Sequence, residues 1–229
     1  MHLEADGPVQ ILHLDETENR FNPTWLAEFD GLLDQVEAAA DPVALVIIGS
    51  GKFWSNGLDL EWMTANPDEI SSVVGVVQSL YARVLSLPIP TVAALHGHTF
   101  AAGAMLALAC DARIMREDRG FFCLPEVDIR IPFTNGMAAL IQAKLTKPAA
   151  HQAMAFGRRF GGADALTAQI VDAVAGDADL RARAVAFASE LAGKDRATLS
   201  AIKRTMYAPA LAALAEPAAS ISLPTPPAA

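Results

Sequence analysis

Cysteine is scarce in this chain, and its scarcity argues against two kinds of site. Only Cys110 and Cys123 occur among 229 residues, and their spacing matches neither a CxxC pair nor a zinc-binding motif. We therefore expect no disulfide framework and no metal site. A reduced, soluble, cytoplasmic protein is the simplest expectation, because disulfides persist mainly in oxidising compartments.

Basic residues are also few, and no long unbroken apolar segment is present. Lys and Arg number 17 against 26 Asp and Glu, and the net charge is -9 without a basic block, so nucleic acid is not an expected partner. The most apolar stretch, residues 89–110, is interrupted by Pro90, His96 and His98, so we expect no membrane span. The acidic residues 1–6 do not resemble a signal peptide.

Hydrophobic residues, in contrast, are plentiful. They make up 52% of the chain, and charged residues only 19%. This composition is enough for one sizeable core, which predicts a single layered domain rather than a disordered chain. Strand-like and helix-like patterns alternate along the sequence. The alternation predicts the α/β class with a largely parallel sheet.

Several segments predict their own boundaries. The apolar, β-branched run at residues 43–48 predicts a strand buried on both faces. The pair Asn22-Pro23 predicts the start of a helix that ends at Asp41-Pro42, since a capping amide precedes a proline at the first helical position. Residues 208–229 predict a short helix at best, followed by a mobile tail. Further strands are predicted at 9–14, 91–95, 112–115 and 121–122, and helices at 70–87, at 105–110 and from Asn135, Pro148, Ala163, Asp177 and Asp195.

Two buried strands each lead into a turn of small residues. Residues 46–48 lead to 55–59, and residues 92–95 lead to 101–103. Small residues allow a ligand to approach main-chain N–H groups, and a helix start adds unpaired N–H groups. Two such turns facing one another would clamp one carbonyl oxygen from both sides, as an oxyanion hole does. Small-residue turns also occur for packing alone, so both interpretations stay open at this point.

Three motifs resemble the signatures of one family. Residues 52–60, KFWSNGLDL, resemble the first signature of the crotonase (enoyl-CoA hydratase/isomerase) superfamily. Residues 93–98 with Ala102-Gly103 resemble the second, and residues 121–126, in which a glutamate follows a proline, resemble the third. The resemblance extends from about residue 9 to about residue 199 with the motifs in order, and together they are far more specific than any one alone.

The resemblance implies a fold and an assembly. The expected fold is the crotonase spiral of ββα units over residues 1–195, followed by a C-terminal helical region. Residues 196–229 are expected to form a short C-terminal helix and a tail rich in proline and alanine. The family forms trimers and hexamers, so a homotrimer or hexamer is implied. The short C-terminus departs from the family pattern, in which terminal helices cover the site and join subunits.

The resemblance also implies roles for single residues. Main-chain N–H groups of Leu58 and Ala102 fall on the oxyanion-hole positions. The first glutamate of the hydratases falls on Met105, which cannot carry a proton, and the second falls on Glu126. The sequence around Arg119-Gly120-Phe121 is most similar to that of the Δ3,Δ2-enoyl-CoA isomerase branch, which keeps only the second glutamate.

One carboxylate suffices to move a double bond, whereas adding water requires a group that activates the water. The implied function is therefore an enoyl-CoA isomerase of fatty acid β-oxidation that moves a C3–C4 double bond of an acyl-CoA to C2–C3. Glu126 would be its only acid/base group. No cofactor or metal is implied, because coenzyme A is part of the substrate. Two alternatives remain: a hydratase-like or other acyl-CoA-transforming crotonase, and a catalytically silent acyl-CoA-binding member.

Structural roles are expected for several other polar residues. Asp128 competes with Glu126, because it shares its face in an extended segment, but a structural role is favoured. Asp59 and Asp111 are expected to cap or to bond backbone groups, and His96 to make a structural hydrogen bond. The residues expected to border the substrate are Gly57, Gly103, Met105 and Trp62. The cations that could bind the coenzyme A phosphates are Arg20, Lys52 and Lys203, although an ordinary solvated charge is the simpler interpretation of each.

Overall fold

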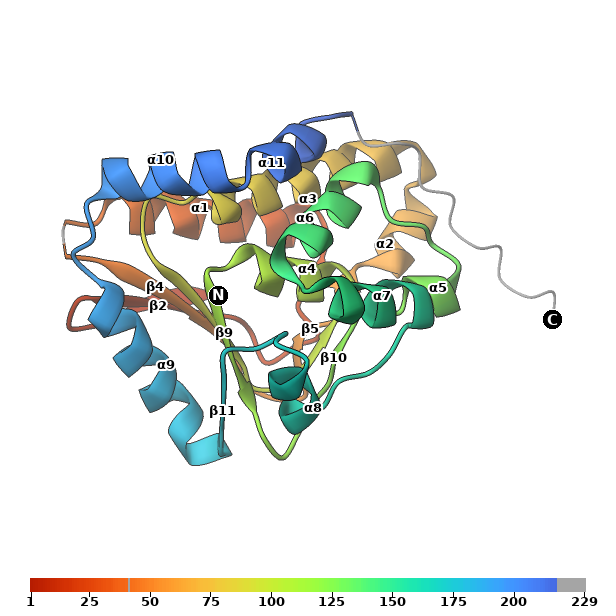
Figure 1. The fold of residues 1–229 in the computed structure, drawn as a ribbon. Helices are drawn as coiled ribbons and strands as arrows, with labels where there is room; N and C mark the ends of the chain where they lie inside the picture. The colour runs from red at the N-terminus through yellow and green to blue at the C-terminus, as the bar shows by residue number, and fades with distance from the viewer. Residues whose placement is uncertain (41, 218–229) are drawn as a thin grey trace.

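A computed structural model describes residues 1–40 and 42–217 (Figure 1). Within this part of the chain, a six-stranded sheet has the strand order β1-β2-β4-β7-β9-β11, in which only the β1–β2 pair is antiparallel. A three-stranded sheet, β10-β8-β5, and a two-stranded sheet, β3-β6, are parallel. The strands are β1 (His2–Asp6), β2 (Val9–His13), β3 (Arg20–Phe21), β4 (Ala44–Ile48), β5 (Phe53–Ser55), β6 (Gly57–Leu58), β7 (Thr91–Leu95), β8 (His98–Phe100), β9 (Ala112–Arg116), β10 (Phe122–Cys123) and β11 (Ala173–Ala175).

Helices cover the sheets and fill the C-terminal half of the chain. They are α1 (Pro23–Ala38), α2 (Leu60–Ala65), the 3-10 helix η1 (Pro67–Glu69), α3 (Ile70–Leu85), α4 (Ala102–Ala109), α5 (Glu126–Ile129), α6 (Asn135–Lys144), α7 (Lys147–Phe156), α8 (Gly162–Thr167), α9 (Asp177–Leu191), α10 (Arg196–Met206) and α11 (Ala208–Leu214). None of the helices in the described ranges is long and apolar enough to span a membrane.

A unit of two strands and a helical segment occurs three times in succession along the chain. Strands β4, β7 and β9 lie side by side in the large sheet, and each is followed in the chain by a strand of the small sheet, β5, β8 and β10. A helical segment follows each pair and returns the chain to the large sheet or to the helical half. This is the spiral of ββα units that the sequence predicts. Its consequence is that the ends of β6, β8 and β10 meet at one place.

Helices cover both faces of the large sheet at its central strands (Figure 1). On one face, α9 packs through Leu180 and Ala184 against apolar side chains of β4, β7 and β9. On the other face, helices α1, α3, α4 and α6 enclose the larger core, which contains Leu45 and Ile47 of β4. All five residues of β4 are buried, as the continuous apolar run predicts.

Helix boundaries follow the capping residues that the sequence offers. The Asn22 side chain accepts a hydrogen bond from Trp25 N, and Pro23 opens α1, as predicted. The Asp195 side chain caps α10 through Thr198 N in the same way. Helix α1 ends at Ala38, ahead of the predicted stop, and Asp41 lies outside the described residues.

Three expectations of the sequence need correction. Helix α4 begins at Ala102, three residues earlier than predicted, because alanine and glycine support a helix start as readily as a loop. The sequence patterns do not predict the edge strands β1 and β11 of the large sheet. They also miss β3, β5, β6 and β8, which are two or three residues long. Glu126 and Asp128 lie on the short helix α5 rather than on an extended segment, so they do not share one face by alternation.

The C-terminal helices pack on the main core. Ala210 and Leu214 of α11 are buried against α6 and α3. Lys203 of α10 is only 3% exposed, and its Nζ donates to Leu87 O at 3.0 Å, to Ile89 O at 2.9 Å and to Asp111 Oδ2 at 2.6 Å. The expected tail lies outside the described residues from residue 218 onward.

Candidate active site

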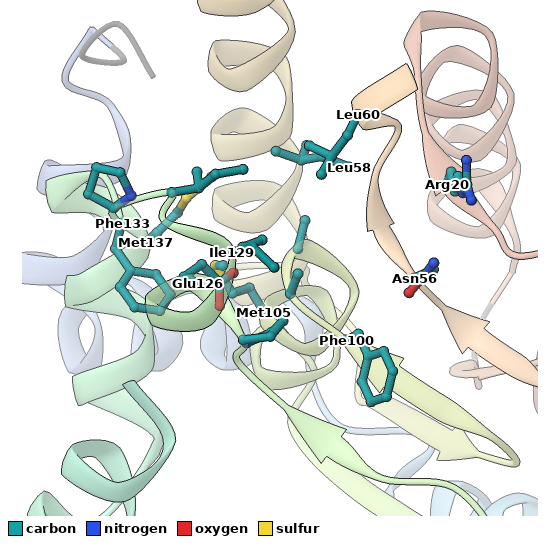
Figure 2. Close-up of a pocket in the computed structure, with 15 residues that line it drawn as sticks. Arg20, Asn56, Leu58, Leu60, Phe100, Met105, Glu126, Ile129, Phe133 and Met137 are labelled. Atoms are coloured by element: carbon teal, nitrogen blue, oxygen red, sulfur yellow. The ribbon is translucent and has the colours of Figure 1, made fainter. Parts of the chain in front are cut away.

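A cavity of about 230 Å³ lies where the ends of β6, β8 and β10 meet (Figure 2). Its walls come from β6, the N-terminal half of α4, the short helix α5, the loop at residues 131–133 and the start of α6. The lining residues are Arg20, Asn56, Leu58, Leu60, Phe100, Ala101, Ala102, Met105, Pro125, Glu126, Ile129, Ile131, Pro132, Phe133 and Met137. The sequence singles out four residues from three separate segments, and all of them line this one cavity: Leu58, Ala102, Met105 and Glu126.

Glu126 is the acidic residue of this cavity. It is the first residue of α5, it is 6% exposed, and its Oε2 has no hydrogen-bond partner within the described part of the chain. Burial raises the pKa of Glu126 to about 8, and the hydrogen bond from its own main-chain N–H lowers it by a smaller amount. A carboxyl group with such a pKa both accepts and returns a proton near neutral pH.

The two small-residue turns are in direct contact. Gly57 has φ +85, and a β-carbon on it would lie 2.9 Å from Ala101 Cβ and 3.0 Å from Ala102 N. A β-carbon on Gly103 would lie 2.5 Å from Ser55 Cβ. Glycine at both positions therefore allows the backbone of β6 to approach the first turn of α4. This contact brings Leu58 and Ala102 to the same edge of the cavity.

The hydrogen bonds of β6 leave Leu58 N–H pointing away from β3. The pairing of β6 with β3 uses Asp59 N–H, which donates to Phe21 O at 3.1 Å. Consecutive N–H groups of an extended chain point to opposite sides. Leu58 N–H is therefore not part of the β3 pairing, and its residue lines the cavity.

Helix α4 begins at a strained residue. Ala101 has φ 50 and ψ -125, a region that L-residues rarely occupy and that costs about 1–3 kcal/mol. Its N–H donates to Cys123 O at 3.0 Å, and its carbonyl accepts from Met105 N at 3.1 Å. The N–H groups of the first turn, including that of Ala102, have no acceptor inside the helix. Ala102 lines the cavity, and it lies at the positive end of the α4 helix dipole.

Met105 lies one turn beyond Ala102 on α4 and lines the same cavity. It is almost fully buried, and its thioether has no acid or base function. Within the described residues, Glu126 is the only cavity-lining side chain that carries a carboxyl group. The cavity therefore offers one proton-carrying group.

The cavity has a polar end and an apolar end (Figure 2). Arg20 Nε and Asn56 Nδ2 both donate to Glu18 Oε2, at 2.6 and 2.9 Å, so one carboxylate orients both side chains. Phe133 and Met137 line the opposite side of the cavity (Figure 2).

Several predicted residues lie elsewhere. Gly57, Gly103 and Trp62 are not among the lining residues, and the two glycines serve the close packing described above. Lys203 is neither a phosphate ligand nor a solvated charge, because it is buried against Asp111 and two carbonyls. Lys52 lies 5.1 Å from the Phe53 ring centroid, outside the cavity.

The structural roles predicted for the other polar residues are found. Asp59 caps α2 through Trp62 N and accepts from Asn22 Nδ2. Asp111 accepts from the Thr91 N–H, and the His96 ring bonds Ser50 O at 2.8 Å. Asp128 does not line the cavity.

Sequence reasoning missed the apolar end of the cavity. Ile131, Pro132, Phe133 and Met137 line the cavity. The first three form an apolar cluster just before the Thr134 helix cap, and Met137 lies on the helix that follows. No group of three or more His, Cys, Asp or Glu side chains able to hold a metal ion is found among the residues described.

The family of the chain follows from these features and from comparison with known proteins. A buried carboxyl group facing two main-chain turns on a ββα spiral defines the crotonase class of site. The sequence profile of the family described as enoyl-CoA hydratase/isomerase matches residues 7–220. The chain belongs to this family.

Relatives within the family include isomerases and hydratases. Enoyl-CoA delta isomerase 3 of Arabidopsis thaliana is 38% identical over 182 residues, which cover 76% of each chain. A probable enoyl-CoA hydratase of Bacillus subtilis (strain 168) is 32% identical over 210 residues, 90% of this chain and 81% of the relative. The crystal structure of human mitochondrial delta3-delta2-enoyl-CoA isomerase superposes with a TM-score of 0.84 at 25% identity, covering 93% of this chain and 85% of the human one.

Proposed function

We propose that the chain is an enoyl-CoA isomerase that moves a C3–C4 double bond of an acyl-CoA thioester to C2–C3. Glu126 is the single acid/base group, and the main-chain N–H groups of Leu58 and Ala102 form the oxyanion hole. The observation that carries the proposal is the pairing of Glu126 with Met105, a carboxyl group and a thioether, in one cavity. The identity to plant delta isomerases supports the same reaction.

The reaction runs in two proton transfers. Ionised Glu126 removes a proton from C2, the electrons of that C–H bond form a C1–C2 double bond, and the thioester oxygen takes the negative charge. Two N–H donors stabilise this charge, an effect worth about 10²–10³-fold per donor. The electrons then return from the oxygen, C2–C3 becomes double, and the C3–C4 electron pair takes the proton from Glu126 at C4. Atoms and charge balance, and the carboxylate is regenerated.

The surroundings of Glu126 suit both transfers. A pKa of about 8 makes the carboxylate a stronger base than a solvated glutamate and its acid form still able to give the proton back. The apolar lining keeps water from the enolate, and Met105 provides no group to activate a water molecule. Hydration therefore lacks a general base at this position.

The polarity of the cavity supports one orientation of the substrate. The coenzyme A moiety is assigned to the end with Arg20 and Asn56, where anionic and polar groups find donors. The acyl chain is assigned to the end with Phe133 and Met137, where apolar surface is removed from water.

Deuterium exchange at C2 tests the proposal. The wild type is expected to exchange the C2 proton of a 3-enoyl-CoA in heavy water and to form the 2-enoyl product, whereas Glu126→Gln binds the ligand and does neither. Turnover by Glu126→Gln would refute the single-glutamate shuttle. Hydration of a trans-2-enoyl-CoA without isomerisation would favour a hydratase, and tight binding without exchange by the wild type would favour a silent binding protein.

A further inference from the structure

Tyr81 connects a helix outside the cavity to the first turn of α4. It lies on α3, its side chain is fully buried, and its hydroxyl donates a hydrogen bond of 2.8 Å to Ala102 O. Tyr81 does not line the cavity. Its hydroxyl therefore contacts the residue that carries one proposed oxyanion donor without being in a position to contact the substrate.

Hydrogen bonds hold Ala102 from both sides. On its N-terminal side, Ala101 N–H is bonded to Cys123 O of β10, and Ala101 is in a strained conformation. On its C-terminal side, the Tyr81 hydroxyl holds the Ala102 carbonyl. The Ala102 N–H lies between these two anchors. The direction of this N–H therefore depends on both hydrogen bonds. If one of them is lost, the strain at Ala101 favours rotation of the peptide group between Ala101 and Ala102.

The hydroxyl is not needed to satisfy the Ala102 carbonyl. That carbonyl is in the first turn of α4, so a helical N–H four residues on is directed at it. A phenylalanine at position 81 would fill nearly the same volume and leave no buried donor unpaired. What the hydroxyl adds is a fixed point outside the helix, on α3.

The hydroxyl keeps its proton throughout the working range. Burial raises the pKa of Tyr81 well above its usual value, and the charge of Glu126 raises it further. The group is thus a permanent donor to Ala102 O, and the contact does not change when Glu126 gains or loses its proton.

From these contacts we infer that the Tyr81 hydroxyl is a positioning group for the oxyanion hole, acting through the Ala102 backbone. The inference rests on the proposed function, since the Ala102 N–H has this role only if it binds the thioester oxygen. Loss of the hydroxyl is expected to lower kcat about tenfold, less than the loss of a donor itself costs. KM changes little, because the walls of the cavity stay intact.

Tyr81→Phe tests the inference, and the chain offers a matched control. The sequence has two tyrosines, and the other, Tyr207, receives a hydrogen bond of 3.3 Å from Lys144 Nζ outside the cavity. Each Tyr→Phe variant loses one hydroxyl contact. The readouts are kcat and KM with a 3-enoyl-CoA, and the carbonyl stretching frequency of a bound saturated acyl-CoA. Tyr81→Phe is expected to lose kcat and part of the frequency shift, and Tyr207→Phe neither.

Three outcomes decide the matter. A kcat within twofold of the wild type and an unchanged carbonyl frequency in Tyr81→Phe would overturn the inference. So would a displaced pH midpoint of kcat/KM, which would mean that Tyr81 acts on Glu126. If the wild type does not isomerise 3-enoyl-CoA, the proposed function fails, and the carbonyl frequency still reports separately whether Tyr81 directs the Ala102 N–H.

Discussion

Glu126 and Met105 face the same cavity from two different helices, α5 and α4. One is a buried carboxyl group whose Oε2 has no hydrogen-bond partner among the residues the structure describes, and the other is a thioether. Under the proposed function, this arrangement leaves Glu126 as the group through which a proton leaves and returns.

Glu126→Gln is expected to lower kcat for isomerisation by about 10²–10⁴-fold while acyl-CoA binding persists, because the amide keeps the size of the side chain and cannot carry the proton. Steady-state kinetics and equilibrium binding measure the two effects. Asp128→Asn is the matched control, an acid-to-amide change on the same short helix outside the cavity. Equal losses in both variants would mean that damage to α5, rather than a missing base, explains the result.

The activity is expected to rise with pH. Because the pKa of Glu126 is about 8, the fraction of ionised base increases as the pH rises through that value. The midpoint of kcat/KM against pH, measured from pH 6 to 10, should lie near 8. A flat profile over this range would contradict a buried, single base.

The same pKa shift makes stability fall with pH. Between the ordinary value of 4.5 and about 8, the unfolded chain ionises Glu126 while the folded protein keeps the proton. The folded state then binds more protons, so the free energy of unfolding decreases over this window and levels off above it. Each pKa unit is worth about 1.4 kcal/mol. Glu126→Gln should therefore gain stability relative to the wild type between pH 5 and pH 9, as denaturant titrations would measure.

Met105→Glu is expected to raise the pH midpoint of isomerisation, since a second carboxyl group in the cavity disfavours ionisation of Glu126. It also supplies a group that can activate water, so hydration of a trans-2-enoyl-CoA should become measurable. Met105→Gln has a similar size without the charge and serves as the control. Equal pH midpoints in the two variants would argue that position 105 lies too far from Glu126 to influence it.

Gly103→Ala is expected to destabilise the fold by about 1–3 kcal/mol, because the added carbon would lie 2.5 Å from Ser55 Cβ in a packed contact. Gly75→Ala is the control on α3. A β-carbon there meets nothing within 4 Å, so helix propensity should stabilise it by about 1 kcal/mol. Thermal unfolding of both variants separates the clash from a general effect of replacing glycine.

Lys203→Met is expected to cost about 3–5 kcal/mol, because removing one partner leaves the Asp111 carboxylate and two carbonyls without their cation. Lys194→Met, at an exposed position, should change stability little. Denaturant midpoints measure the difference. A small loss at Lys203 would mean that Thr91 and water satisfy Asp111 unaided.

Much of the fold could be predicted because its signals are local. The apolar run of β4, the capping pair at the start of α1 and the Asp195 cap of α10 each carry their own boundary in a few residues. The short helix α5 could not be predicted, because four residues show no helical period. The edge strand β11 depends on β9, a pairing partner distant in sequence. The edge strand β1 pairs with the adjacent strand β2, but its residues are mostly exposed and form no apolar run.

The candidate site divides in the same way. Motif resemblance identified Glu126, Met105, Leu58 and Ala102, and the structure brings all four to one cavity. Contacts between residues far apart in the chain could not be predicted from local sequence patterns. Lys203 Nζ bonds Leu87 O from 116 positions away, whereas the sequence predicts a solvated charge, because lysine is normally exposed.

The two proposed donors belong to the main chain, and this has a consequence for mapping the site. Replacing side chains with alanine leaves Ala102 unchanged and removes from Leu58 only a piece of the wall, so such a scan would detect Glu126 and overlook the groups that hold the charge. Replacing the Ala102 amide by an ester removes the N–H group itself. Only a change of this kind would measure what the main-chain donor contributes.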